Sequence, residues 1–160
     1  MQFTILSTLA ALLGLATAAP SAGNPFLILK RADFHPGGTN DYCGEVASPV
    51  YTTSSPSPKA SDCKNIPSTV SSSGYWAVSQ GDGEATLATS GSCAFKVIFV
   101  GSGKDKEGFD FGTNDVQFYI NSYAGKTDSD GRVEVAGSVA CNAGDGSGKT
   151  VDVKWRLTRA

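Results

Sequence analysis

The sequence predicts an α+β fold, a two-layer sandwich in which two helices cover one side of an antiparallel sheet of four or five strands. Residues 131–142 and 150–158 alternate apolar and polar side chains, the pattern of strands with one buried and one solvated face. Residues 113–124 instead place apolar and aromatic side chains at helical spacing. Because the buried face of the sheet needs a covering layer, the predicted helices must supply it.

Residues 1–18 predict a secretory signal peptide. Their apolar core runs from about Phe3 to Leu15, which is shorter than the roughly 20 residues needed to span a bilayer. Ala16 and Ala18 form the A-x-A pattern that precedes a cleavage site, here after Ala18 or Ala19. The alternative is a buried N-terminal helix in a chain that keeps these residues.

Residues 19–31 predict a pro-segment that ends at Lys30-Arg31, a dibasic pair of the kind that secretory-pathway proteases cleave. The alternative is a chance pair on the surface. The mature chain would be one domain, residues 32–160. Loss of the pair takes the formal net charge from −2 to −4, and no basic cluster remains. We therefore expect no nucleic-acid partner, and no membrane span, since no second apolar run is long enough.

The four cysteines, Cys43, Cys63, Cys93 and Cys141, all lie in the predicted mature chain. An even number in a secreted chain predicts two disulfides. Their wide spacing and the single histidine do not fit a zinc site, so we expect no metal or cofactor. We prefer the pairing Cys63–Cys93 with Cys43–Cys141, because Cys63 projects from a predicted helix and Cys93 and Cys141 from strands toward one core. Four cysteines allow three connectivities, and the sequence leaves the other two open.

The first part of the mature chain predicts little regular structure. A short strand is expected around Cys43, and residues 48–61 are rich in Pro, Ser and Thr, which indicates a loop. A short helix then follows, with Ser61 or Asp62 as its N-cap and Pro67 as a source of distortion. The residues on its apolar face are Cys63, Ile66 and Val70.

The middle of the chain predicts two strands, at 74–80 and 92–101, followed by a polar loop and the clearest helix. Thr113 is its expected N-cap, and Asp115 lies in the first turn, where the helix dipole favours an anion. Its apolar face holds Val116, Tyr119, Ile120 and Tyr123.

The two C-terminal strands have clear buried faces. These faces consist of Val133, Val135, Gly137, Val139 and Cys141 in the first strand and of Val151, Val153, Trp155 and Leu157 in the second. On the solvated faces, Glu134 and Arg132 are expected to pair with Lys154 and Arg156 across the ladder.

These elements occur in an order that resembles a known family. "YCGE" at 42–45, "SDC" at 61–63 and Trp76 come first; "GSCAFKV" at 91–97, "GTNDVQFYI" at 112–120, "GRVEVAGSVACN" at 131–142 and "VDVKWRL" at 151–157 follow. Over about residues 41–158 the chain is similar to the fungal extracellular-protein-2 effectors, also described by a necrosis-inducing-factor domain. Pro67 and the polar stretch "GSGKDKEGFDF" depart from this pattern.

The resemblance implies a secreted fungal virulence protein of the host apoplast, with a fold similar to killer-toxin α/β sandwiches. It carries no catalytic residues that could be transferred to this chain. We therefore expect a monomer, not an enzyme, that binds a host plant or microbial surface protein or glycan through residues 47–60 and 102–112. A killer-toxin-like antimicrobial protein and a secreted hydrolase are the alternatives.

The residues themselves give little support for catalysis. His35 is the one histidine and lies in a Gly/Pro-rich segment next to the predicted cleavage site, where we expect a flexible surface side chain. Asp110 and Asp115 flank the start of the second predicted helix and are interpreted as a loop charge and a cap rather than a glycosidase pair. Among the aromatic residues, Tyr51 and Tyr75 are the freest for binding, whereas the periodic positions of Trp76, Trp155, Tyr119 and Tyr123 indicate core.

Overall fold

The computed structural model describes residues 32–70, 72–79, 83–100 and 108–160, and these ranges contain two helices and eight strands. The elements, in chain order, are β1 (Asp33–Pro36), β2 (Ala47–Tyr51), α1 (Ala60–Thr69), β3 (Gly74–Val78), β4 (Glu84–Ser90), β5 (Cys93–Phe99), β6 (Phe109–Gly112), α2 (Thr113–Tyr123), β7 (Val135–Asn142) and β8 (Thr150–Arg159). The predicted α+β class is confirmed.

The strands form two antiparallel sheets, where the sequence predicted one. The larger sheet has the order β2-β7-β8-β5-β4, and the smaller has the order β1-β3-β6. The strand predicted at 74–80 therefore lies in a different sheet from the strand predicted at 92–101. An isolated bridge between Phe109 and Ala143 links the two sheets.

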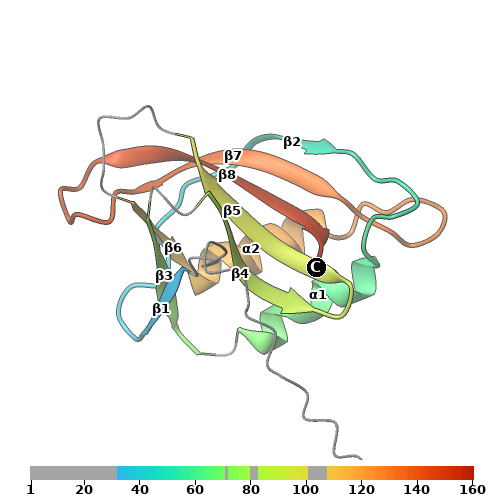
Figure 1. Ribbon diagram of the computed structural model, residues 1–160, viewed down its shortest axis with the longest axis horizontal. Coiled ribbons are helices and arrows are strands. Elements are labelled where there is room, and N and C mark those ends of the chain that lie inside the picture. Colours follow the sequence, from blue (N-terminus) through green and yellow to red (C-terminus); the bar gives the residue numbers. More distant parts are fainter. Residues whose placement is uncertain (1–31, 71, 80–82, 101–107) are drawn as a thin grey trace, which may run out of the picture.

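Figure 1 shows α1, α2 and the smaller sheet on the same side of the five-stranded sheet. The covering layer predicted from helices alone is thus completed by three short strands. The opposite face of the large sheet carries charged side chains, including Arg156, whose guanidinium hydrogen-bonds Glu84 at 2.6 Å. Lys96 lies 4.0 Å from the same carboxylate.

The predicted apolar faces of both helices are confirmed. Cys63, Ile66 and Val70 of α1 are buried, and the helix continues through Pro67 to Thr69. On α2 the buried residues include Val116, Tyr119 and Ile120. Burial drives this arrangement, because short helices gain most of their stability from packing of one apolar face.

Both helix starts differ from the prediction. The N-cap of α1 is Lys59, which makes no side-chain cap, and Asp62 instead accepts hydrogen bonds from Ser92. The N-cap of α2 is Gly112, one residue before the predicted Thr113. A carboxylate at the third helical position, Asp115, accepts the Gly112 N–H at 2.8 Å, which satisfies a donor at the helix start.

The core is built around stacked aromatic rings. The Trp155 ring lies 5.1 Å from Tyr119, 5.5 Å from Tyr123 and 5.9 Å from Phe95, in all three cases nearly parallel. The alternating faces predicted for 131–142 and 150–158 supply much of this core, and their burial confirms those strands. Trp76, Trp155 and Tyr119 are buried, as predicted for core residues.

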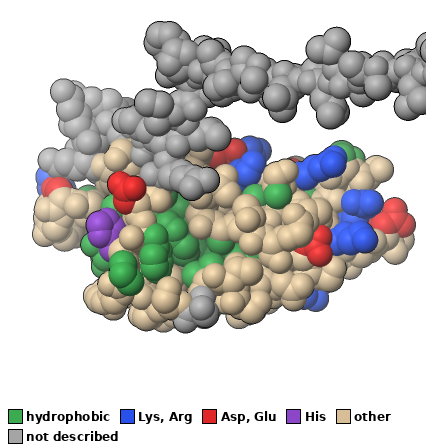
Figure 2. All heavy atoms as spheres, turned by 60° about the horizontal axis from the view of Figure 1, so that its bottom comes forward, with side chains coloured by type: hydrophobic (Ala, Val, Ile, Leu, Met, Phe, Trp, Pro, Cys, Tyr) green, Lys and Arg blue, Asp and Glu red, His purple; other side chains and the backbone are tan. Residues whose placement is uncertain are grey.

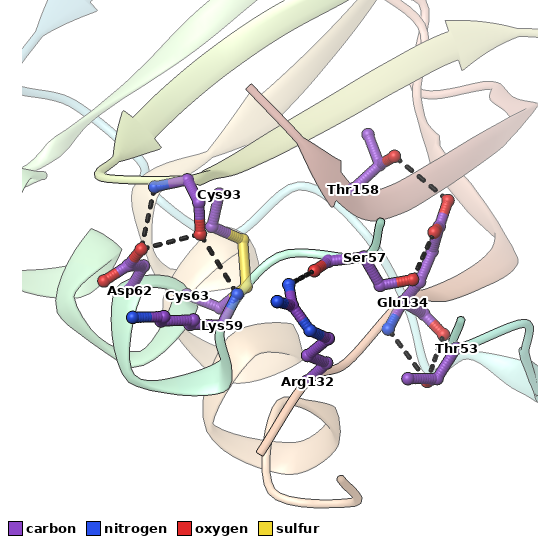
Figure 3. The surroundings of a disulfide bond; sticks show 10 residues. Thr53, Ser57, Lys59, Asp62, Cys63, Cys93, Arg132, Glu134 and Thr158 are labelled. Atoms are coloured by element: carbon purple, nitrogen blue, oxygen red, sulfur yellow. Dashed lines mark hydrogen bonds between the residues drawn. A yellow bond between two sulfur atoms is a disulfide. The ribbon is translucent and has the colours of Figure 1, made fainter. Parts of the chain in front are cut away.

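Two disulfides join the core layers, in the pairing preferred from the sequence. Cys63 on α1 bonds Cys93 on β5, and Cys43 bonds Cys141 on β7. Figure 3 shows the first of these next to the Asp62 carboxylate. Cys43 itself lies in an isolated bridge to Cys141 rather than in the short strand that was predicted.

Figure 3 also shows that Glu134 and Arg132 have other partners than the predicted ones. The Glu134 carboxylate accepts hydrogen bonds from Ser57 at 2.8 Å and Thr158 at 3.0 Å. Arg132 donates to the carbonyl of Ser57 at 2.7 Å. The segment before α1 is thereby fixed to the residues that precede β7, and the predicted loop 48–61 contains ordered structure, including part of β2.

Candidate functional site

A groove opens where β1, β3, β4 and the end of α1 meet, with a volume of about 410 Å³. Its described lining residues are Phe34, Thr69, Val70, Ser72, Trp76, Leu87, Ala88 and Thr89. Figure 2 shows hydrophobic side chains gathered beside the histidine, and His35 follows Phe34 in β1. This volume is within the range of ligand-binding pockets.

The pairing of the small sheet places three aromatic residues in a row that runs from the core to the surface. Phe34 on β1 is opposite Trp76 on β3, which is opposite Phe111 on β6. Their exposed fractions are 38%, 7% and 0%. The Phe34 and Trp76 rings lie 5.1 Å apart in a tilted arrangement. The groove therefore has a buried aromatic residue in its inner wall and a half-exposed aromatic side chain at its rim.

The chemistry of the groove is that of a neutral surface with both polar and apolar parts. None of its eight described lining residues carries a charge, and its polar groups are the hydroxyls of Thr69, Ser72 and Thr89. The Thr69 hydroxyl donates to the carbonyl of Ile66 at 2.8 Å. Such a surface can bind an apolar side chain, a ring or a sugar face, whereas acid–base chemistry would need titratable groups from elsewhere.

The other face of the small sheet carries His35. Its ring stacks on Tyr75 at 4.9 Å, and Tyr42 lies 5.0 Å from the same tyrosine. Burial raises the pKa of the nearby Asp110 carboxyl, and the charge of His35 opposes that rise. His35 is on the surface as predicted, but it lies in strand β1 rather than in a flexible tail, because β1 pairs with β3.

A second hollow, of about 540 Å³, lies beside the start of α2. It is lined by Asp41, Glu45 and Asp115 together with Phe118, which is 52% exposed. Burial raises the pKa of Asp115 to about 6, against the opposing effect of hydrogen bonds from the backbone N–H groups of Tyr42 and Gly112, while Asp41 adds to the rise. Asp115 thus caps the helix and holds Tyr42 and Cys43 by their N–H groups.

Several predicted site residues do not come together. Tyr51 on β2 donates to the carbonyl of Tyr123, whereas Tyr75 lies on the small sheet. Of the stretch 102–112 proposed as a binding loop, 109–112 is the buried strand β6, and residues 102–107 lie outside the described ones. The processing residues Ala18, Lys30 and Arg31 are also outside, and their roles stay predictions.

The sequence analysis did not identify the groove. Phe34 received no role, Trp76 was interpreted as core alone, and residues 84–90 were not assigned to a strand. The available signal was the pair of apolar residues Ala85 and Leu87 at alternate positions. Both are buried in β4.

The family of the chain follows from the match between its sequence and a family model. The model Hce2, described as "Pathogen effector; putative necrosis-inducing factor", matches residues 42–141. This chain belongs to that family. The Hce2 match begins next to Cys43, ends at its disulfide partner Cys141, and includes β2 to β7. Most of the groove lies inside the match, but Phe34 lies before it.

No protein of curated function matches the chain. Neither helix of the described part is long and apolar enough to cross a membrane. The described residues also contain no cluster of three or more His, Cys, Asp or Glu side chains that could hold a metal ion.

Proposed function

We propose that this Hce2 family member is a secreted fungal effector that acts in the host apoplast by binding a host or competitor surface component, without catalysing a reaction. The observation that carries this proposal is the open groove with Phe34 at its rim and Trp76 in its wall. A concave surface with an exposed aromatic side chain at its rim is characteristic of binding sites.

The covalent framework supports action outside the cell. Two disulfides are formed, and no described cysteine is free. Disulfides persist in oxidising compartments and are rare in the cytosol. Two partly or fully buried carboxylates have structural partners, since Asp115 caps α2 and Glu134 binds Ser57 and Thr158.

The test is infiltration of the purified mature chain into leaves. Two variants are compared, each of which replaces one exposed phenylalanine with serine. Phe34→Ser removes the exposed ring of the groove, and Phe118→Ser removes a more exposed ring at the second hollow. We expect the leaf response to fall at least about tenfold with Phe34→Ser and to persist with Phe118→Ser, because hot-spot contacts are concentrated in few aromatic residues. An equal response to both variants would contradict the groove as the binding site.

The two alternatives have separate assays. Growth inhibition of fungi at concentrations that leave leaves unaffected would favour a killer-toxin-like antimicrobial role. The hydrolase alternative has one specific observation behind it, the position of His35 near Asp110. Turnover of RNA or cell-wall glycans that disappears in His35→Ala would replace the binding proposal with an enzyme.

A further inference from the structure

We infer that the groove between Phe34 and Trp76 binds an uncharged sugar ring of a host or competitor surface glycan. This inference rests on the proposed function of the groove as the binding surface, and it names the class of ligand that the groove takes. Three properties of the described lining lead to it: the absence of charge, the exposed hydroxyls, and an apolar part that is exposed mainly at the rim.

The lack of charge in the described lining selects against an ionised ligand. A charged group that leaves water for a site without a counter-charge loses hydration free energy that the site does not restore. Charged side chains lie elsewhere, as on the outer face of the large sheet, where Arg156 pairs with Glu84. The ligand that fits the groove is therefore neutral.

The exposed hydroxyls of the groove require a ligand that forms hydrogen bonds. Polar atoms make up the larger share of its exposed lining. Ser72 and Thr89 are exposed, and their hydroxyls make no hydrogen bond to another described residue. Thr69 donates to the carbonyl of Ile66, which leaves its own oxygen able to accept. A wholly apolar ligand would remove water from these hydroxyls without replacing its hydrogen bonds.

The exposed apolar part of the groove is largely limited to the rim. Phe34 is 38% exposed, whereas Val70, Trp76 and Leu87 are exposed by only 7%, 7% and 8%. The apolar anchors of bound peptides need a pocket that encloses them, and little apolar surface lies open behind the rim for that purpose. A sugar ring instead has a flat face of C–H groups, which packs on the negative face of an aromatic ring while its hydroxyls remain free to bond.

The ring of Phe34 is held in position by the small sheet. It lies 5.1 Å from the ring of Trp76. A Cβ at Gly74 would come within 2.9 Å of the Phe34 Cζ atom, so the glycine leaves the space in which this ring lies against β3. A ring fixed in this way loses little conformational freedom on binding, which favours a ligand with few contacts.

The first experiment measures binding of oligosaccharides to the 32–160 form by isothermal titration calorimetry. The neutral probes are oligomers of glucose, xylose and N-acetylglucosamine, and the charged probes are oligomers of galacturonic acid and glucosamine. We expect a Kd of about 0.1 to 1 mM for at least one neutral probe and at least tenfold weaker binding of the charged ones. Failure of every neutral probe to bind, or equal binding of the charged probes, would overturn the inference.

The second experiment separates a sugar from an apolar peptide side chain. Phe34→Leu keeps an apolar side chain but removes the flat ring, and Thr89→Val removes a hydroxyl with little change of shape. We expect sugar binding to weaken at least about tenfold in Phe34→Leu and about three- to tenfold in Thr89→Val. Thr86→Val, at an exposed position of the same strand outside the groove lining, is the control and should bind normally. Full binding by Phe34→Leu and Thr89→Val would indicate a purely apolar contact, as with a peptide, and would contradict a sugar.

The leaf response distinguishes failure of this inference from failure of the proposed function. Loss of the response in Phe34→Ser, without binding of any neutral sugar, would remove this inference and leave the proposed function standing with a protein as the partner. Sugar binding that is lost in Phe34→Leu, without a leaf response to any form, would do the reverse.

Discussion

The Asp62 carboxylate accepts hydrogen bonds from both the backbone N–H and the hydroxyl of Ser92, at 2.8 and 2.6 Å. Each residue directly precedes a cysteine of the Cys63–Cys93 disulfide. The start of α1 is therefore joined to the turn before β5 by a covalent and a polar contact side by side (Figure 3). The same serine hydroxyl accepts the N–H of Lys59, the residue before α1.

This contact predicts acid sensitivity at Asp62. The hydrogen bonds from Ser92 lower the pKa of Asp62 below its ordinary 3.8, so its stabilising contribution is present at neutral pH and is lost as the pH falls below about 3.8. Asp62→Asn should lower the melting temperature at about pH 7, and the difference from the wild type should shrink toward about pH 2. A difference that is constant over this range would contradict the assignment.

Asp115 predicts the opposite pH dependence. Burial raises its pKa to about 6, so the folded state binds a proton more tightly than the unfolded chain does. Its contribution to stability should rise as the pH falls from about 6 to about 4, by no more than about 3 kcal/mol. Denaturant unfolding at several pH values should show this gain in the wild type and its absence in Asp115→Asn.

Gly137 predicts a steric cost for any side chain. A Cβ at this position of β7 would lie 2.7 Å from Cγ1 of Val46 and 2.8 Å from Nε1 of Trp155. Gly137→Ala should therefore lower the free energy of unfolding by about 1–3 kcal/mol, because the stacked core leaves little room for the ring to move. Gly125→Ala, where a Cβ meets nothing within 4 Å, is the control and should leave stability nearly unchanged.

The two disulfides should differ in their contribution to stability. Cys43–Cys141 closes a separation of 98 residues and Cys63–Cys93 one of 30. Loop entropy then gives contributions of about 4.7 and about 3.6 kcal/mol. Chemical denaturation of the two double-alanine variants should show a larger loss for the first pair. The reverse order would mean that packing of the buried Cys63–Cys93 pair outweighs loop length.

The elements that could be predicted from sequence are those with a regular pattern of burial. β7 and β8 alternate cleanly, and α2 has a continuous apolar stripe, so periodicity was sufficient. β1 was missed because all four of its residues are exposed and one is proline. β4 has a register shift between Thr86 and Ala88, which weakens the alternation.

The groove could not be predicted because its wall is assembled from four separate segments. Phe34, Val70, Trp76 and Leu87 come from β1, the end of α1, β3 and β4. Only the pairing of β1 with β3 brings Phe34 next to Trp76, and β1 itself has no sequence signal. The alternating position of Trp76 predicts that its side chain is buried. It does not show that part of the ring lines a groove.

The central place of β8 has a consequence for folding. β8 lies between β7 and β5 in the large sheet, although it follows both of them in the chain. β7 and β5 are not neighbours and cannot pair with each other first, so the five-stranded sheet closes only when β8 is inserted between them.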